Sequence, residues 1–104
     1  MNERRSEERV PLRIQVRWGA SSAQQTASIS DISIDGCFIA TSGQAALGEK
    51  IDLEIELPRG SWLALRGVVI HHQPQEGFGL RFTDTTYEER KAIAELIDSR
   101  LDPR

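Results

Sequence analysis

Hydrophobic and polar residues alternate along most of the chain, which is the pattern of β-strands with one buried face. The clearest alternation covers residues 12–18 (LRIQVRW) and residues 51–57 (IDLEIEL). Four further segments show shorter or weaker strand patterns: 26–32, 36–41, 62–72 and 78–82. The segment 62–72 is long enough to pair with two neighbouring strands, and Gly67 is the expected place for a bend or bulge.

The pattern changes to helical spacing near the end of the chain. Thr86 is followed three residues later by Glu89, which is the spacing of a capping box. Apolar residues then recur at helical intervals, at Ile93, Leu96, Ile97 and Leu101. Six short strands and one helix predict an all-β fold with one C-terminal helix, in which the strands form a six-stranded antiparallel β-barrel. We expect the helix over about residues 86–101, packed on the barrel or across its mouth.

Length and composition limit the class of protein. At 104 residues the chain has the size of one domain, which can bury a core without disulfides or metals. Its only cysteine, Cys37, cannot form an intrachain disulfide and is expected to be a small buried hydrophobe. Trp18 and Trp62 are also expected in the core. No apolar run approaches the length of a membrane span or of a signal peptide, so we expect a soluble cytoplasmic protein without direct membrane insertion.

The charges are distributed unevenly. The net charge is -3, yet the first seventeen residues hold five arginines against three glutamates. An acidic balance argues against non-specific binding to nucleic acid, which favours a broad basic surface. A local group of arginines is better suited to a small anion, because the guanidinium group can contact phosphate or a base edge through two hydrogen bonds.

No catalytic or metal-binding pattern is present in the sequence. His71 and His72 are adjacent on a predicted strand, so their side chains are expected on opposite faces, and no cysteine or carboxylate cluster stands at ligand spacing beside them. Ser33 lacks the nucleophile-elbow sequence of a hydrolase. We therefore predict that the protein is not an enzyme, and we predict no metal and no cofactor.

Two short stretches are candidates for ligand binding. Arg5 and Arg9 frame the polar stretch RRSEER at residues 4–9, although pairs with this spacing are expected by chance in a chain so rich in arginine. The stretch DISIDG, residues 31–36, places Asp31 and Ser33 on one face of an extended strand. Gly36 allows a bend or the close approach of a ligand. Taken alone, Asp31, Ser33 and Gly36 are at least equally well explained as ordinary turn residues between two strands.

The order of these motifs resembles the PilZ domain family. The resemblance covers roughly residues 3–101 and rests on Arg5-x-x-x-Arg9 before a strand, Asp31-x-Ser33-x-x-Gly36, LGEKIDLEIELP, and FGLRF before a terminal helix. It implies a barrel that binds the bacterial second messenger cyclic di-GMP. The ligand-binding residues carried over from the family motifs are Arg5, Arg9, Asp31, Ser33 and Gly36.

Two further positions qualify the resemblance. Arg4 directly precedes the first motif, and in similar domains an arginine there accompanies the binding of two stacked ligand molecules. His71 ends the fifth predicted strand, where relatives often carry an aromatic residue that packs near a guanine. We therefore add Arg4 and His71 to the predicted ligand-binding residues.

These expectations combine into a hypothesis of function. Residues 1–9 are expected to form a flexible arm, and residues 10–104 the barrel with its helix. Cyclic di-GMP would order the arm over the barrel and create a surface for an effector protein, such as a component of motility, pilus, secretion or exopolysaccharide (biofilm) machinery, or a kinase. Two alternatives remain: a PilZ-like adaptor that does not bind nucleotide, and a small barrel that binds single-stranded nucleic acid. The acidic balance disfavours the nucleic-acid alternative.

Overall fold

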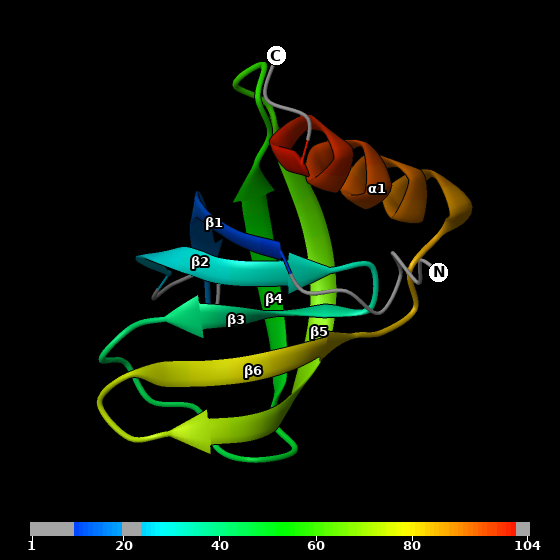
Figure 1. The fold of residues 1–104 in the computed structure, drawn as a ribbon. Helices are drawn as coiled ribbons and strands as arrows, with labels where there is room; N and C mark the ends of the chain where they lie inside the picture. The colour runs from blue at the N-terminus through cyan, green and yellow to red at the C-terminus, as the bar shows by residue number, and fades with distance from the viewer. Residues whose placement is uncertain (1–9, 20–23, 102–104) are drawn as a thin grey trace, which may run out of the picture.

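The computed structural model describes residues 10–19 and 24–101, so the predicted arm with Arg4, Arg5 and Arg9 lies outside the described residues. The described chain contains the strands β1 (Val10–Trp18), β2 (Gln25–Ser33), β3 (Gly36–Ala40), β4 (Lys50–Glu56), β5 (Trp62–Gln73) and β6 (Gly77–Phe82), and then the helix α1 (Tyr87–Leu101). All strand pairs are antiparallel, and they close into a barrel in the order β1-β2-β3-β6-β5-β4 (Figure 1). The predicted fold is confirmed.

The long strand β5 allows the barrel to close. Its first part pairs with β4 and its second part with β6, as predicted. Gly67 lies where the two ladders meet, and a Cβ atom there would stand 2.9 Å from the carbonyl oxygen of Arg81. The expected bulge, however, is not at Gly67 but between Val69 and His71, at Ile70. The glycine serves a close approach between backbones, whereas the extra residue that shifts the register comes three positions later.

Alternate residues of the strands fill the interior of the barrel. The fully buried side chains include Val16, Ile29, Ile32, Cys37, Ile39, Leu53, Ile55, Val69, Phe78 and Leu80. Apart from the pair Ile29 and Ile32, which are three residues apart, these positions follow the alternation seen in the sequence, and Cys37 is buried as expected. The other face of each strand is the outer surface of the barrel, and it carries the charged residues of the strands.

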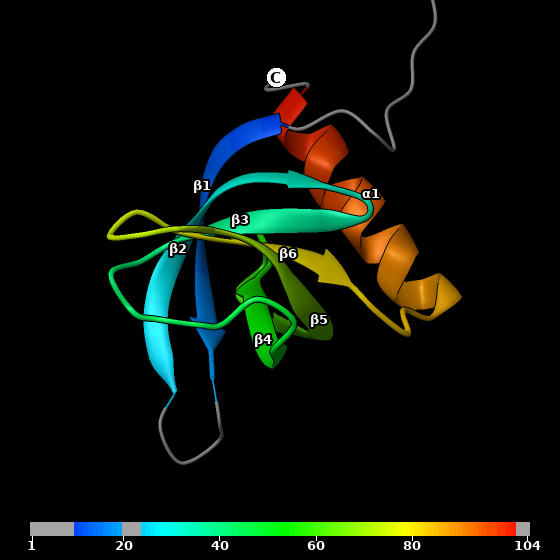
Figure 2. The same cartoon turned by 90° about the horizontal axis from the view of Figure 1, so that it is seen from below.

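The helix α1 lies across one end of the barrel, against β1, β2 and β5 (Figures 1 and 2). The predicted capping box is present: Thr86 Oγ1 accepts a hydrogen bond from Glu89 N–H at 3.1 Å, and Glu89 Oε1 accepts one from Thr86 N–H at 2.9 Å. Ile93, Leu96 and Ile97 extend the barrel core into the helix. Across the described residues, no helix has both the length and the apolar character to span a membrane.

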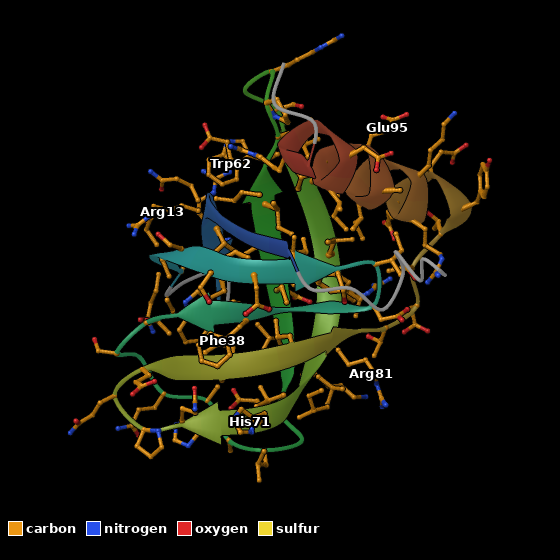
Figure 3. The ribbon with its side chains drawn as sticks, in the orientation of Figure 1. Arg13, Phe38, Trp62, His71, Arg81 and Glu95 are labelled. Atoms are coloured by element: carbon orange, nitrogen blue, oxygen red, sulfur yellow. The ribbon has the colours of Figure 1, made fainter. Side chains whose placement is uncertain are left out.

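The two tryptophans lie in different environments. Trp18 is buried, with its ring centroid 4.9 Å from that of Phe78 in an edge-to-face arrangement, as expected for a core residue. The expectation that Trp62 belongs to the core is wrong. Its neighbour Leu63 pairs with the buried Ile55, so Trp62 faces outward at the edge of the barrel (Figure 3). There the guanidinium of Arg17 covers the indole ring at 3.8 Å from its centroid.

Candidate functional site

The stretch DISIDG forms the end of β2 and its turn into β3. The side chain of Ser33 is only 4% exposed. Its hydroxyl accepts a hydrogen bond from the Asp35 N–H at 3.3 Å and lies 3.4 Å from the carbonyl oxygen of Gly36, to which it donates. Ser33 therefore stabilises the hairpin turn, and its predicted contact with a ligand stays a prediction.

Gly36 also has a role in the fold. It pairs with Ser33 on one side and with Arg81 of β6 on the other. A Cβ atom at this position would overlap the carbonyl oxygen of Leu80, so the barrel can close here only around a glycine. The predicted ligand contact of Gly36 stays a prediction as well.

Asp31 reaches the outer surface because of a bulge in β2. The register shifts between Ile29 and Asp31, so that Ile29 and Ile32 are both fully buried although they are three residues apart. Asp31, between them, is half-buried on the outer face. The bulge in β5 at Ile70 has the same effect, since it places His71 on the outer face, opposite Gly79.

The two bulges align a row of residues across four strands, which we call the outer-face row. Asp31 of β2 is opposite Phe38 of β3, Phe38 is opposite Gly79 of β6, and Gly79 is opposite His71 of β5. A pocket of about 210 Å³ lies over this row, lined by Asp31, Cys37, Phe38, Ile70, His71 and Gly79. Figure 3 shows Phe38 and His71 on this side of the barrel, with β6 between them. The structure thus brings the predicted residues Asp31 and His71 to one pocket.

Phe38 was not among the predicted site residues. It lies within the apolar run CFIA, whose neighbours Cys37 and Ile39 are fully buried, so composition alone marks the whole run as core. Strict alternation across Cys37, Phe38 and Ile39 would have placed the ring outside.

Arg81 is a second residue that the sequence reasoning missed. It lies on the exposed outer face of β6, opposite Gly36 and two residues from Gly79 (Figure 3). Residues two apart on a strand share a face at about 6.8 Å, so Arg81 is beside the pocket. The alternation in FGLRF could have identified it, because Phe78, Leu80 and Phe82 face inward.

Other pockets lie elsewhere on the described surface. One of about 500 Å³ contains no carboxylate in its lining, which consists of Arg13, Ser28, Ile29, Ser30 and Ala40. A pocket of about 440 Å³ includes Asp52, Glu54, Asp84 and Glu89 in its lining and is predominantly acidic. His72 pairs with the buried Phe78, so it lies on the opposite face of the sheet from His71, as predicted. Residues 10–19 and 24–101 contain no group of three or more histidine, cysteine or carboxylate side chains that could hold a metal ion.

Comparison with protein families matches the PilZ domain over residues 3–99. The chain therefore belongs to the PilZ domain family, whose members are cyclic di-GMP receptor and adaptor domains. No curated protein matches the chain.

Several solved structures share the fold. The PilZ domain of CeSA from a cellulose-synthesising bacterium aligns with a TM-score of 0.71 at 20% identity, covering 92% of this chain and 100% of the other. The Bacillus subtilis inhibitor of motility (MotI/DgrA) aligns with a TM-score of 0.79 at 17% identity, covering 96% of this chain but 52% of the other. The Borreliella burgdorferi PlzA protein, solved in complex with c-di-GMP, aligns with a TM-score of 0.62 at 16% identity, covering 90% of this chain and 41% of the other. At these identities the likeness concerns the fold alone, and the chain spans about half or less of the last two proteins.

Proposed function

We propose that the protein is a receptor that binds cyclic di-GMP on the outer face of the barrel, over β2, β3, β6 and β5. The observation that carries the proposal is the outer-face row, which assembles Asp31 and His71 at one pocket in a chain of the PilZ family. Cyclic di-GMP presents two phosphates and two guanines, so its site needs cations for phosphate and acceptors for the guanine edge. A carboxylate such as Asp31 can accept from the N1–H and N2–H₂ donors of guanine.

The predicted arm supplies the cations in this proposal. Arg5 and Arg9 contact the phosphates or stack on a base, and Arg4 helps to hold a second, stacked ligand molecule. Each hydrogen bond to a charged group contributes roughly 1.5–3 kcal/mol, so four or five such contacts at the middle of this range contribute roughly 9–11 kcal/mol, more than the roughly 8 kcal/mol of micromolar binding. The excess offsets the cost of ordering residues 1–9, and the ordered arm then forms the surface that an effector protein recognises.

A binding measurement with two arginine variants tests the site. Retention of labelled cyclic di-GMP in equilibrium dialysis should be lost in Arg9→Ala, because the guanidinium contact with phosphate is removed. Arg59→Ala is the matched control, since Arg59 is exposed on the turn between β4 and β5 and away from the outer-face row. Equal loss in both variants, or retention in Arg9→Ala, would contradict the assignment.

Hydrogen exchange tests the signalling step. With saturating cyclic di-GMP, the amides of residues 2–9 should exchange more slowly than in the free protein, while the core of β4 should not change. Unchanged exchange of residues 2–9 in a protein that binds the ligand would remove the proposed mechanism but leave the receptor function in place.

One alternative has support in the structure. Ser33 and Gly36 both stabilise the β2–β3 hairpin, so the motif that contains them would be retained in an adaptor that binds no nucleotide. The same dialysis measurement separates the two functions, because an adaptor would retain no cyclic di-GMP at any concentration.

A further inference from the structure

We propose that Phe38, together with the bare backbone at Gly79, forms a stacking platform for one guanine of the ligand, and that Ile70 borders this platform. The inference rests on the proposed function and adds three residues to it. It assigns to Phe38 the part of the binding that fixes the position of the base.

The position of Phe38 is set by two glycines of β6. A Cβ atom at Gly77 would lie 2.8 Å from Cε2 of Phe38, and one at Gly79 would lie 3.9 Å from Cδ1. The ring therefore lies against a stretch of β6 that is free of side chains, and Figure 3 shows it on the outer surface over this strand. A ring held in place before binding loses little freedom when a base stacks on it, which favours affinity.

The neighbours of the ring match the chemistry of guanine. Asp31 is directly opposite Phe38, and the Cβ atoms of such a pair are about 4.5–5.5 Å apart. A base stacked on the ring would present its edge to the Asp31 carboxylate. His71 lies two strands from Phe38, beyond Gly79. The open position at Gly79 is therefore where a planar group fits between the two side chains.

Ile70 supplies an apolar border on β5. It is 49% exposed, an unusual position for isoleucine, and it lines the same pocket as Phe38 and His71. The bulge that turns His71 outward is also what leaves Ile70 on the surface. Stacking on an aromatic ring tolerates any base, so on this platform the choice of guanine comes from Asp31 and the position of the base from Phe38.

The ring also has a simpler role, because it covers the backbone of β6. The test must therefore separate cover from stacking. Phe38→Leu keeps an apolar cover over Gly77 and Gly79 but removes the aromatic face, whereas Phe38→Trp keeps that face. Tyr87→Leu is the matched control, since Tyr87 is an aromatic residue, 76% exposed on α1, that does not line the pocket.

Calorimetric titration with cyclic di-GMP compares the affinity of each variant with that of the original protein. We expect Phe38→Leu to weaken binding about 5- to 150-fold, the range for loss of one base–aromatic stack, while Phe38→Trp and Tyr87→Leu stay within about threefold of the original protein. In proton NMR spectra of the original protein, a nuclear Overhauser effect should connect the ring protons of Phe38 with H8 of one bound guanine. This signal identifies the Phe38 ring itself and does not require any variant to fold.

The outcomes separate the two proposals. If the original protein binds cyclic di-GMP but Phe38→Leu binds equally well, or no guanine proton shows a nuclear Overhauser effect to the Phe38 ring, the platform is refuted and the receptor function stands. If the original protein binds no cyclic di-GMP, both are refuted.

Discussion

Gly36 belongs to the predicted ligand motif, yet the structure requires a glycine there for the fold. In Gly36→Ala the new methyl group would overlap the carbonyl oxygen of Leu80 and lie 3.2–3.3 Å from the adjoining backbone atoms of Leu80 and Arg81. Backbone cannot rotate away as a side chain can, so β3 and β6 must separate. Overpacking costs about 1–3 kcal/mol and a lost ladder hydrogen bond about 1 kcal/mol. We expect the free energy of unfolding to fall by about 2–4 kcal/mol, and the midpoint of thermal unfolding by about 10–30 °C.

Urea unfolding measures this change, followed by the fluorescence of the two tryptophans, of which Trp18 is buried. Gly79→Ala is the matched control on the adjacent strand, because its methyl group would meet only His71 Cβ at 3.4 Å and Phe38 Cδ1 at 3.9 Å, which are ordinary contacts. This variant should remain within about 1 kcal/mol of the original protein. Equal unfolding midpoints for the two variants would refute the reasoning. If the expected difference is found, loss of ligand binding in Gly36→Ala cannot by itself be taken as evidence of a ligand contact.

Three further predictions concern the helix, the outer surface and the pocket. Thr86→Ala should lower the free energy of unfolding by about 1 kcal/mol in urea titrations, because it removes one half of the capping box, whereas Thr85→Ala, which makes neither bond, should have little effect. Arg17→Lys should lower the free energy of unfolding by about 0.5–1 kcal/mol in the same measurement, since lysine cannot stack flat on Trp62 while pairing with Glu54. In the Trp62→Leu background, where the indole ring is absent, the same substitution should leave the free energy of unfolding unchanged. Arg81→Ala should lower the affinity for cyclic di-GMP at least tenfold in calorimetry, as expected for the loss of one hydrogen bond to a charged group. An unchanged affinity would exclude Arg81 from the site.

The fold could be predicted from the sequence because its signals are local. The alternation around Val16 and Leu53 identifies strands with one buried face, and the spacing of Thr86 and Glu89 identifies the start of the helix. The order of the strands around the barrel, β1-β2-β3-β6-β5-β4, depends on contacts between distant segments. It was not predicted from the sequence.

The site was predicted less completely because bulges break the alternation. Without the extra residues at Ser30 and Ile70, the period of two would not place Asp31 and His71 on the outer face. Register between strands is likewise absent from the sequence, and it is register that puts Phe38 between Asp31 and Gly79. Trp62 was wrongly expected in the core because a large aromatic residue suggests burial, whereas here Arg17 covers it on the surface.

The central claim is that the outer-face row, with the arm, recognises cyclic di-GMP through its guanines. Calorimetric titration of the full chain with cyclic di-GMP, cyclic di-AMP and GTP, repeated with Asp31→Ala, tests it most directly. The account predicts saturable heat with cyclic di-GMP alone and a loss of affinity in Asp31→Ala. The stoichiometry should be two ligand molecules per chain, as a stacked pair requires. No saturable heat with cyclic di-GMP, or equal binding of cyclic di-AMP, would contradict it.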